Sequence, residues 1–472
     1  MIPRYDGWRR EKPGLGVWPH RGKVAITGIG HSSVDRRWDG TDMTKTLGAK
    51  AIQACERALA DAGITKDEVD GLLCCPESLA GASIAGAAGM WGPRPFFAPP
   101  YDTEWGLSVV NNNWLIQNMG LKNVKFAPDN VPHIWDQVGM TSQAVGDGHC
   151  KVALMVYTGA NFEGRYRRGG ENAEPTAKGD RAFTAPWGNH GGNDFVNVFP
   201  LQQYCLKYGG TPNDVGPFVI NQHRNGRRAP WGFYTNNEPG MITIEDYKSA
   251  RFILKPLRLW DCDRPVHGVT AYLFTTAERA KDMKQPPVYV LSHSQHNVKP
   301  LSTQPVLKDM EAATDLAAGM LYEGTGLQPK DVDVLNPYDG YSYMTQFWLE
   351  AFKFHGVKRG DAFGFYADDI RVEGPHPFCS GGGNLGNGRT RSAMFTDSIE
   401  QLRGTTGVLQ GFDTNLKNKR KVAGNPEVAF CASSPPMGGG WIALSKNPSS
   451  RRVIPGIAAK PLRGECRGAT PL

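Results

Sequence analysis

The sequence predicts an α/β fold made of two similar halves, and the first observation behind this prediction is an internal repeat. The segments 51–73 and 314–336 both contain an amphipathic helical pattern, then a glycine, a short polar turn and a strand. The two segments lie 263 residues apart, and so do the glycines Gly63 and Gly326 that end their helical patterns. Repetition of this kind indicates a duplicated structural unit.

Two further pairs of apolar segments predict strands in each half. The offset of 263 residues carries the segment 23–30 onto 286–293, so each copy opens with a strand. The segments 151–159 and 427–435 are also alike, at an offset of 276 residues, which implies an insertion of 13 residues in the second copy. Strands that alternate with helices are typical of an α/β protein with a largely parallel sheet. We expect the two copies to pack against each other.

The repeat divides the chain into two halves, an insert and two arms. A stretch that is polar and glycine-rich at its start does not fit the repeat, and we interpret it as a loop domain inserted between the copies, suited to form a wall of a substrate cleft. The predicted organisation is an N-terminal arm at 1–20, the first half at 21–159 with its return at 261–285, the inserted loop domain at 160–260, the second half at 286–448 and a C-terminal arm at 449–472. Within this plan, the run WDCD (260–263) is expected to close the insert onto the core.

Composition narrows the class of protein. A chain of 472 residues is too long for one typical core, and 40% apolar with 21% charged residues is ordinary for a globular protein. No apolar run is long enough to span a membrane, and the N-terminus has no apolar stretch typical of a signal peptide. The net charge of +7 lies largely at the two ends, which favours solvated tails over nucleic-acid binding.

The cysteines predict a reducing compartment. Nine cysteines are scattered along the chain, several of them within apolar runs, as expected for buried thiols of a cytoplasmic protein. No C-x-x-C pair and no His/Cys cluster with zinc spacing occurs, so no metal site is predicted.

A glycine-rich segment late in the second half needs an explanation. Gly381, Gly383 and Gly386 have the spacing of a dinucleotide-binding fingerprint, which works only where a buried strand runs directly into the glycines. The preceding residues 368–380 (DDIRVEGPHPFCS) carry charges and two prolines and lack a block of Val, Ile or Leu. The sequence therefore argues against a nicotinamide enzyme, and these glycines must serve another purpose.

An ordered set of motifs resembles the thiolase superfamily over roughly residues 23–446. The motifs are KVAITGIGHS (23–32), the segment 242–268, YLFTTAERAKD (272–282), NPYDGYS (336–342), CSGGGNLG (379–386) and PPMGGGW (435–441). Together they most closely resemble the sterol-carrier or lipid-transfer branch of that superfamily. The resemblance implies a five-layered αβαβα sandwich built from two βαβα-type halves.

The reactive groups of a thiolase are absent from the matching positions. The nucleophilic cysteine would fall near Val131, but the sequence has no cysteine between Cys75 and Cys150. The acid/base cysteine is replaced by Pro436, and the loop histidine by Gly388. Because thiolases need a thiolate to accept the acyl group, a condensation through an acyl-enzyme is not expected.

What remains resembles the thiolase-like steroid side-chain aldolases, which cleave a β-hydroxy acyl-CoA by a retro-aldol reaction and need no cysteine. These enzymes carry a tyrosine at the position of Tyr338, in NPYDG. They also use a tyrosine at the position of Gly388, which this sequence lacks, so the second acid/base group is left open. The alternatives are a thiolase-like acyltransferase and a non-catalytic lipid-transfer or scaffold subunit.

The candidate catalytic residues are four. Tyr338 is the predicted proton-transfer group, and its ordinary pKa of about 10 must be tuned, or the proton relayed, for work near neutrality. Asp339 either orients a proton relay or caps the helix that follows it. Tyr341, like Tyr343, is an alternative to Tyr338. His376 is either an acid/base or a hydrogen-bonding loop residue.

Two glycine loops are predicted to bind the thioester oxygen, because glycine lets backbone N–H groups approach a ligand closely. Their residues are Gly381, Gly382, Gly383 and Asn384 in one loop and Gly438, Gly439 and Gly440 in the other. No cofactor is expected beyond the coenzyme A of the substrate. The resemblance further implies a homodimer and a small OB-fold, zinc-ribbon partner subunit, which would hold any zinc.

Overall fold

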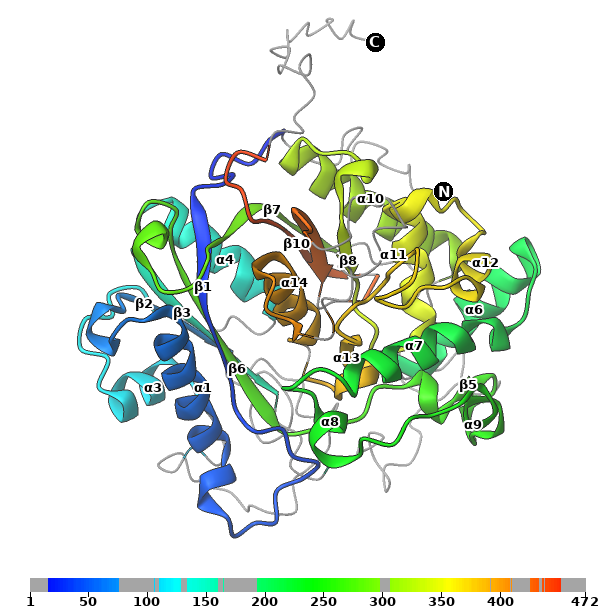
Figure 1. Ribbon diagram of the computed structural model, residues 1–472, viewed down its shortest axis with the longest axis horizontal. Coiled ribbons are helices and arrows are strands. Elements are labelled where there is room, and N and C mark those ends of the chain that lie inside the picture. The colour runs from blue at the N-terminus through cyan, green and yellow to red at the C-terminus, as the bar shows by residue number, and fades with distance from the viewer. Residues whose placement is uncertain are drawn as a thin grey trace, which may run out of the picture.

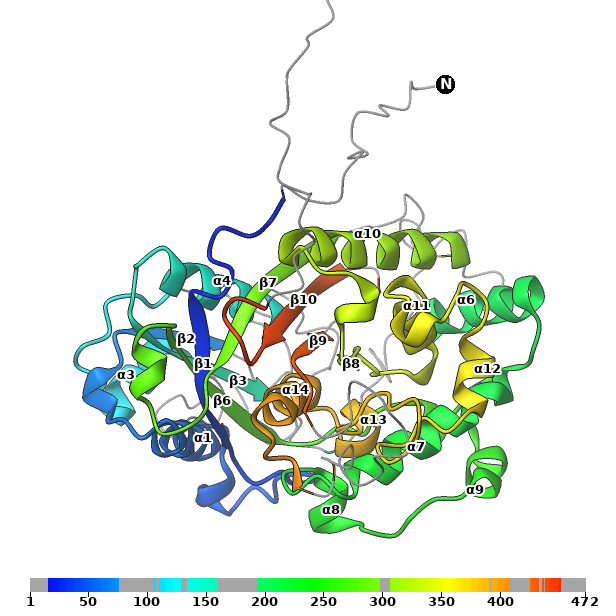
Figure 2. The same ribbon diagram turned by 45° about the horizontal axis from the view of Figure 1, so that its top comes forward.

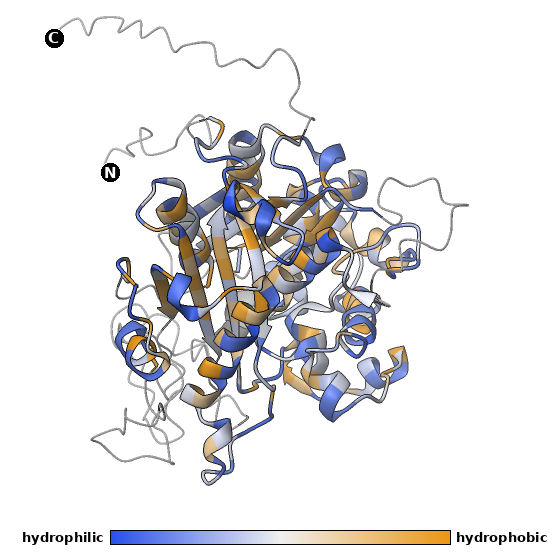
Figure 3. Cartoon of the chain, turned by 60° about the vertical axis from the view of Figure 1, so that its left-hand side comes forward, coloured by the Kyte–Doolittle hydropathy of each residue, from blue (hydrophilic) through white to orange (hydrophobic). Residues whose placement is uncertain are grey.

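Eight strands form one continuous sheet in the order β2-β3-β6-β1-β7-β10-β9-β8. The computed structural model describes residues 16–75, 106, 110–128, 134–159, 164, 193–297, 306–390, 392–407, 409, 425–432, 435–436 and 438–450. The strands are β1 (Val24–His31), β2 (Gly71–Cys75), β3 (Val152–Gly159), β6 (Gly268–Thr276), β7 (Val288–Asn297), β8 (Val334–Asn336), β9 (Val428–Ala432) and β10 (Gly438–Ser445). Much of these strands consists of residues with high hydropathy, as the colouring in Figure 3 shows.

The strand order confirms the duplicated architecture. Reading outward from the junction of β1 and β7, the first half places β1, β6, β3 and β2, and the second half places β7, β10, β9 and β8. The helices α1 (Leu47–Ala62) and α10 (Leu307–Thr325) occupy equivalent places and end on the left-handed glycines Gly63 (φ 74°) and Gly326 (φ 69°). Left-handed glycine is a common helix C-terminus because it has no Cβ to clash.

The sheet is mixed, and here the prediction of a largely parallel sheet is wrong. Only the outer pairs β2–β3 and β8–β9 run parallel, whereas the other neighbouring pairs run antiparallel. In the second half the cause is local: only residues 433–437 separate β9 from β10, too few for the crossover that a parallel pair requires. In the first half, β6 follows β3 only after the long insert, which brings the chain back in the opposite direction.

Five layers follow from the way the helices cover the strands (Figures 1 and 2). The central helices α4 (Ile134–Gly146) and α14 (Ala393–Arg403) share one buried cluster with strands of both halves. Outer helices cover the opposite faces: α1 and α3 (Asn112–Met119) in the first half, α10 and α11 (Thr345–Ala351) in the second. The predicted αβαβα sandwich is confirmed.

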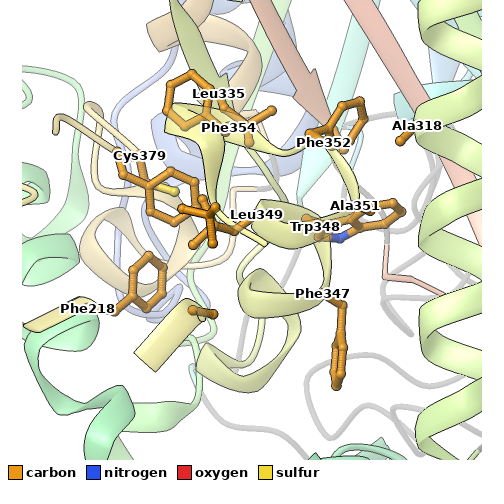
Figure 4. Packing of buried hydrophobic residues seen from close by; sticks show 14 of the residues in the cluster. Phe218, Ala318, Leu335, Phe347, Trp348, Leu349, Ala351, Phe352, Phe354 and Cys379 are labelled. Atoms are coloured by element: carbon orange, nitrogen blue, oxygen red, sulfur yellow. The ribbon is translucent and has the colours of Figure 1, made fainter. Parts of the chain in front are cut away.

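The described part of the insert is mainly helical, and most of it packs on the second half. It contains α6 (Asn193–Tyr208), α7 (Gly216–Gly226), α8 (Phe233–Asn237), α9 (Ile244–Ser249) and the hairpin strands β4 (Phe252–Leu254) and β5 (Leu257–Arg258). Phe218 of α7 belongs to the same buried cluster as Phe347 and Trp348 of α11, part of which appears in Figure 4. Residues 160–163 and 165–192, and the predicted arms before 16 and after 450, lie outside the described residues.

The WDCD run joins the insert to the core, as predicted. Asp261 is fully buried and accepts hydrogen bonds from Tyr247 of the insert (3.0 Å) and from Ser342 (2.7 Å) and Tyr343 (2.9 Å) beyond β8. Two further short helices, α12 (Ala362–Ala367) and α13 (Gly383–Asn387), follow in the second half.

In the part of the chain that the structure describes, no helix combines the length and apolar character needed to cross a bilayer.

Candidate active site

The candidate site lies where the carboxyl end of β8, the glycine loop before α13 and helix α7 of the insert meet. Asp339 connects all three. Its Oδ1 accepts a hydrogen bond from the backbone N–H of Asn384 (2.6 Å), and its Oδ2 accepts from Gln222 Nε2 (2.6 Å) and from the N–H of Leu385 (3.2 Å). Asp339 therefore caps α13, and the alternative in which it caps the helix that directly follows it is wrong.

Asp339 is buried and electrostatically unusual. Its side chain has no exposed surface. Burial raises the pKa of Asp339 from 3.8 to about 7, although the hydrogen bonds from Asn384, Gln222 and Leu385 lower it in part. A buried carboxyl that accepts three hydrogen bonds orients the chain around it, and the catalytic role of Asp339 stays a prediction.

The pKa of Asp339 has a consequence for stability. Since the folded-state pKa lies above the unfolded value, its contribution is fully present below about pH 4 and is lost as the pH rises through about 7. We expect the free energy of unfolding of the wild type, relative to an Asp339→Asn variant, to fall between these pH values by up to about 4 kcal/mol. Urea unfolding of both proteins across this range measures the difference. A difference that does not change with pH would contradict the raised pKa.

Close packing against neighbouring atoms explains why this loop contains glycines. A Cβ on Gly382 (φ 79°) would lie 2.3 Å from the backbone nitrogen of Gly226 in α7, and one on Gly383 would lie 2.1 Å from Oδ2 of Asp339. A Cβ on Gly386 would lie 2.1 Å from the carbonyl oxygen of Gln222. These glycines let α13 press its backbone against α7 and against the Asp339 carboxylate.

This packing corrects the predicted oxyanion role of most of this loop. The N–H of Asn384 is donated to Asp339, that of Gly382 to the Cys379 carbonyl (3.1 Å) and that of Gly381 to the Asp397 carboxylate. These three groups are already satisfied within the protein and are not available to a thioester oxygen. For Gly383 the oxyanion role stays a prediction.

The second glycine loop forms the start of β10. Gly438 and Gly440 pair with Asn297 and Gln295 of β7, and Gly438 and Gly439 are partly exposed. Gly440 lines a cavity of about 20 Å³ together with Ile134, Val138, Phe395, Cys431, Ala432, Trp441 and Ile442. This position is at the centre of the molecule, beside both central helices, where the thioester-binding role predicted for 438–440 remains a prediction.

Tyr338 and Asp339 belong to different surroundings although they are neighbours in sequence. Tyr338 is 9% exposed and is part of the central cluster that contains Met344 of the following turn and Met394 of α14. A Cβ on Gly340 would lie 2.2 Å from the Tyr338 hydroxyl, so the phenol folds back over this glycine. The structure thus places the phenol toward the central layer and the carboxylate toward the insert.

The two other tyrosines of the motif differ from Tyr338. The hydroxyl of Tyr343 donates to Asp261 and to the carbonyl of Pro256 (3.1 Å), and burial followed by the Asp261 charge raises its pKa. Tyr343 is therefore a structural residue. Tyr341 is partly buried, and its backbone pairs with Cys262 of the WDCD run.

The structure does not place His376 beside the other candidate residues, Tyr338 and Asp339. Within the described residues, Nδ1 of its ring lies against the carboxylate of Asp368, and the ring also contacts those of His355 and Phe365. These contacts do not test the predicted acid/base role of His376. Among the described residues, His376 has no hydrogen-bond, ion-pair or ring contact with Tyr338, Asp339 or the glycine loops.

The thiols near the site are not activated. Cys379 lies in the outer cluster of the second half (Figure 4), and burial followed by the charges of Asp339 and Asp397 raises its pKa. Burial also raises the pKa of the Cys431 thiol, to about 12. Neither thiol can supply a thiolate near neutrality. The position near Val131 lies outside the described residues.

Position 388 has no room for a catalytic side chain. Gly388 has a φ of 80°, and a Cβ there would lie 2.6 Å from Cγ1 of Val266. The family's acid/base residue is therefore missing at a position where the loop packs closely against Val266, just after the insert.

Two residues central to this geometry were missed by sequence reasoning. Gln222, which binds Asp339, lies 117 residues before it and belongs to no recognised motif. Asp397, which binds the loop at Ser380, lies in a helix where several polar residues stand among apolar ones. The three consecutive polar residues Thr396, Asp397 and Ser398, which stand between apolar ones, were a signal that could have pointed to Asp397.

A much larger cavity than the one beside Gly440 lies elsewhere. It measures about 1220 Å³ and lies between α10 and residues 350–359, lined by Tyr322, Leu327 and Arg359 among others. It also includes Asp333, which precedes β8, whereas Tyr338 follows β8. This cavity is at the opposite end of the strand and is not the candidate site.

Comparison with known proteins gives the class of protein to which this geometry corresponds. Residues 294–422 match the family model described as thiolase C-terminal domain-like. Among solved structures, the Ltp2-ChsH2(DUF35) aldolase superposes with a TM-score of 0.66 at 21% identity, covering 90% of this chain and 98% of that one. The chain has the thiolase fold, and the resemblance to the thiolase superfamily is confirmed.

Within that superfamily the chain is similar to aldolases. It is 28% identical over 398 residues to 17-hydroxy-3-oxo-4-pregnene-20-carboxyl-CoA lyase of Mycobacterium tuberculosis, covering 82% of this chain and 92% of the relative. It is 26% identical over 411 residues to the steroid side-chain-cleaving aldolase of Thermomonospora curvata, covering 84% and 94%.

Proposed function

We propose that this chain is a carbon–carbon lyase that cleaves a bulky, steroid-type β-hydroxy acyl-CoA by a retro-aldol reaction. The observation that carries the proposal is Tyr338, which stands just after β8 in a thiolase frame whose thiols Cys379 and Cys431 are not activated. The similarity to two steroid aldolases over more than four fifths of the chain supports the choice of reaction and substrate class.

The reaction requires one base and one acid step. The base removes the proton of the β-hydroxyl, the hydroxyl oxygen becomes a carbonyl, and the bond between the α and β carbons breaks. The electron pair of that bond passes to the thioester as an enolate, which is then protonated at the α carbon. In this scheme Tyr338 handles the hydroxyl proton, and backbone N–H groups near Gly383 or Gly438–Gly440 hold the enolate oxygen.

Asp339 has an indirect part in this scheme. By binding Gln222 and the first N–H groups of α13, it fixes the peptide that carries Tyr338 relative to the glycine loop and the insert. Such fixation matters because small displacements of a catalytic group reduce the rate strongly.

The proposed assembly is a homodimer that works with a small OB-fold, zinc-ribbon subunit in the cytoplasm. The aldolase that superposes on this chain bears the name of a second component, ChsH2(DUF35), beside that of Ltp2, which supports a partner subunit. A partner of this kind could supply part of the substrate site that this chain does not complete, in line with the missing group at Gly388.

The test is incubation of the chain, alone and with a candidate partner subunit, with a steroid-type β-hydroxy acyl-CoA. We expect release of a shorter acyl-CoA and a steroid ketone or aldehyde, both detected by mass spectrometry. A covalent acyl-enzyme on the intact protein would instead support an acyltransferase. Tight binding without turnover, with every partner present, would support a carrier or scaffold role.

A further inference from the structure

The end of β8 and the loop before α13 are fastened to the same buried carboxylate. Asp397 of α14 is 1% exposed, and its Oδ2 accepts hydrogen bonds from Ser380 Oγ (2.5 Å) and from Asn336 Nδ2 (2.8 Å). Its Oδ1 accepts from Gln401 Nε2 (3.3 Å), and the N–H of Gly381 donates to the carboxylate as well. Three segments distant in sequence thus meet at one side chain.

The polar groups around Asp397 are all hydrogen-bond donors. Every polar group named above can donate to it, and a carboxylate accepts hydrogen bonds without offering any. The pKa of Asp397 is raised above its usual value because burial outweighs the hydrogen bonds from Ser380, Asn336 and Gln401, which lower it in part. Because buried polar groups are costly to leave without a partner, these hydrogen bonds hold the three segments together at Asp397.

Asp397 connects the two parts of the candidate site, Tyr338 and the glycine loop. Asn336 is the last residue of β8 and stands two residues before Tyr338, and Ser380 stands three residues before Gly383. Helix α14 also contributes Met394 and Phe395 to the cluster that contains Tyr338. Asp397 is therefore linked to the site in two ways: through Asn336 and Ser380, which lie close in sequence to site residues, and through the packing of α14.

We propose that Asp397 is a positioning residue that sets the distance between Tyr338 and the glycine loop. The inference rests on the proposed function, since its kinetic effect is defined for the retro-aldol reaction. Asp397 does not touch the substrate. It acts by holding Asn336 and Ser380 on one carboxylate, so that the phenol and the loop keep a fixed separation.

A matched control exists at the other end of the same strand. Asp333 is 3% exposed, and its Oδ2 accepts hydrogen bonds from the N–H groups of Glu427 (2.8 Å) and Val428 (3.0 Å). It is a buried, multiply bonded aspartate of the same half, but it lies before β8 and away from Tyr338. An Asp333→Asn variant measures the cost of disturbing such a carboxylate without disturbing the site.

The experiment compares Asp397→Asn with Asp333→Asn in the full chain with its partner subunit. For Asp397→Asn we expect a loss of about 100-fold in kcat with KM changed by less than about threefold, because displacement of a catalytic group affects the rate more than binding. Asp333→Asn should keep kcat within about threefold of wild type. If Asp397→Asn does not fold, Ser380→Ala, which removes one of the donors, carries the same test with a loss of about tenfold.

Hydrogen exchange provides the readout that does not depend on turnover. Peptides covering 336–340 and 380–386 should exchange faster in Asp397→Asn, whereas those covering 427–429 should do so in Asp333→Asn. Equal kcat losses in the two variants, or unchanged exchange in 336–340 and 380–386, would overturn the inference. A wild type without retro-aldolase activity would refute the proposed function, and the exchange data would still decide whether Asp397 joins the two segments.

Discussion

A Tyr338→Phe variant is expected to lose between about 10²- and 10⁴-fold in kcat while folding normally, because general acid–base catalysis by one side chain contributes an effect of that size. The substitution removes only the hydroxyl and keeps the ring that packs in the central cluster with Met344 and Met394. Steady-state kinetics with a β-hydroxy acyl-CoA, alongside thermal unfolding, measures both consequences.

The control for this variant is Tyr322→Phe in α10. The hydroxyl of Tyr322 donates to the carbonyl of Phe352 (2.7 Å) in the outer layer, so its removal costs a partly buried hydrogen bond of about 1 kcal/mol but no catalytic group. Tyr322→Phe should keep full kcat. Full activity in Tyr338→Phe would exclude the phenol from the chemistry. Another group around the central layer would then be the proton-transfer group.

A Gly386→Ala variant is expected to lose about 2–3 kcal/mol in the free energy of unfolding and most of its activity. The added Cβ would meet the backbone carbonyl of Gln222 at 2.1 Å, and neither α7 nor α13 can yield without moving backbone. Movement of α7 also displaces the Gln222 amide from Asp339, which disturbs the peptide that carries Tyr338. Urea unfolding and kcat are the two measurements.

Gly364→Ala in α12 is the matched substitution. Gly364 has helical neighbours, and a Cβ there would have no atom within 4 Å. Because alanine is a better helix former than glycine, this variant should be neutral or gain up to about 1 kcal/mol. A Gly386→Ala protein as stable as Gly364→Ala would show that α7 and α13 are less tightly packed than the contact implies.

The duplicated fold could be predicted from the sequence because each copy carries local signals. Gly63 and Gly326 end equivalent helices, and β3 and β9 begin at the equivalent residues Val152 and Val428. The strand directions could not be predicted in the same way. They depend on how the chain returns through β6 after a long insert and through β10 after a short turn, and neither return leaves a periodic pattern in the residues.

The candidate site was predictable in part. Tyr338 and the glycine loop could be found from their motifs, but the roles of the glycines could not, since these depend on Gly226 and Gln222 of a helix more than 150 residues earlier. A glycine that admits a substrate and a glycine that admits a neighbouring backbone look the same in a sequence. Asp339 is a similar case, because only the fold reveals that α13 is the helix it caps.

The seam between the two half-sheets is short: β1 and β7 are joined by only two residue pairs, Ala25 with Tyr289 and Ile26 with Val288. So few ladder bonds cannot by themselves fix the angle between the copies, and that angle must come from side chains interleaved around α4 and α14. Evolution can therefore change the angle between the copies by altering the size of a few apolar side chains around α4 and α14, leaving the backbone of either copy intact.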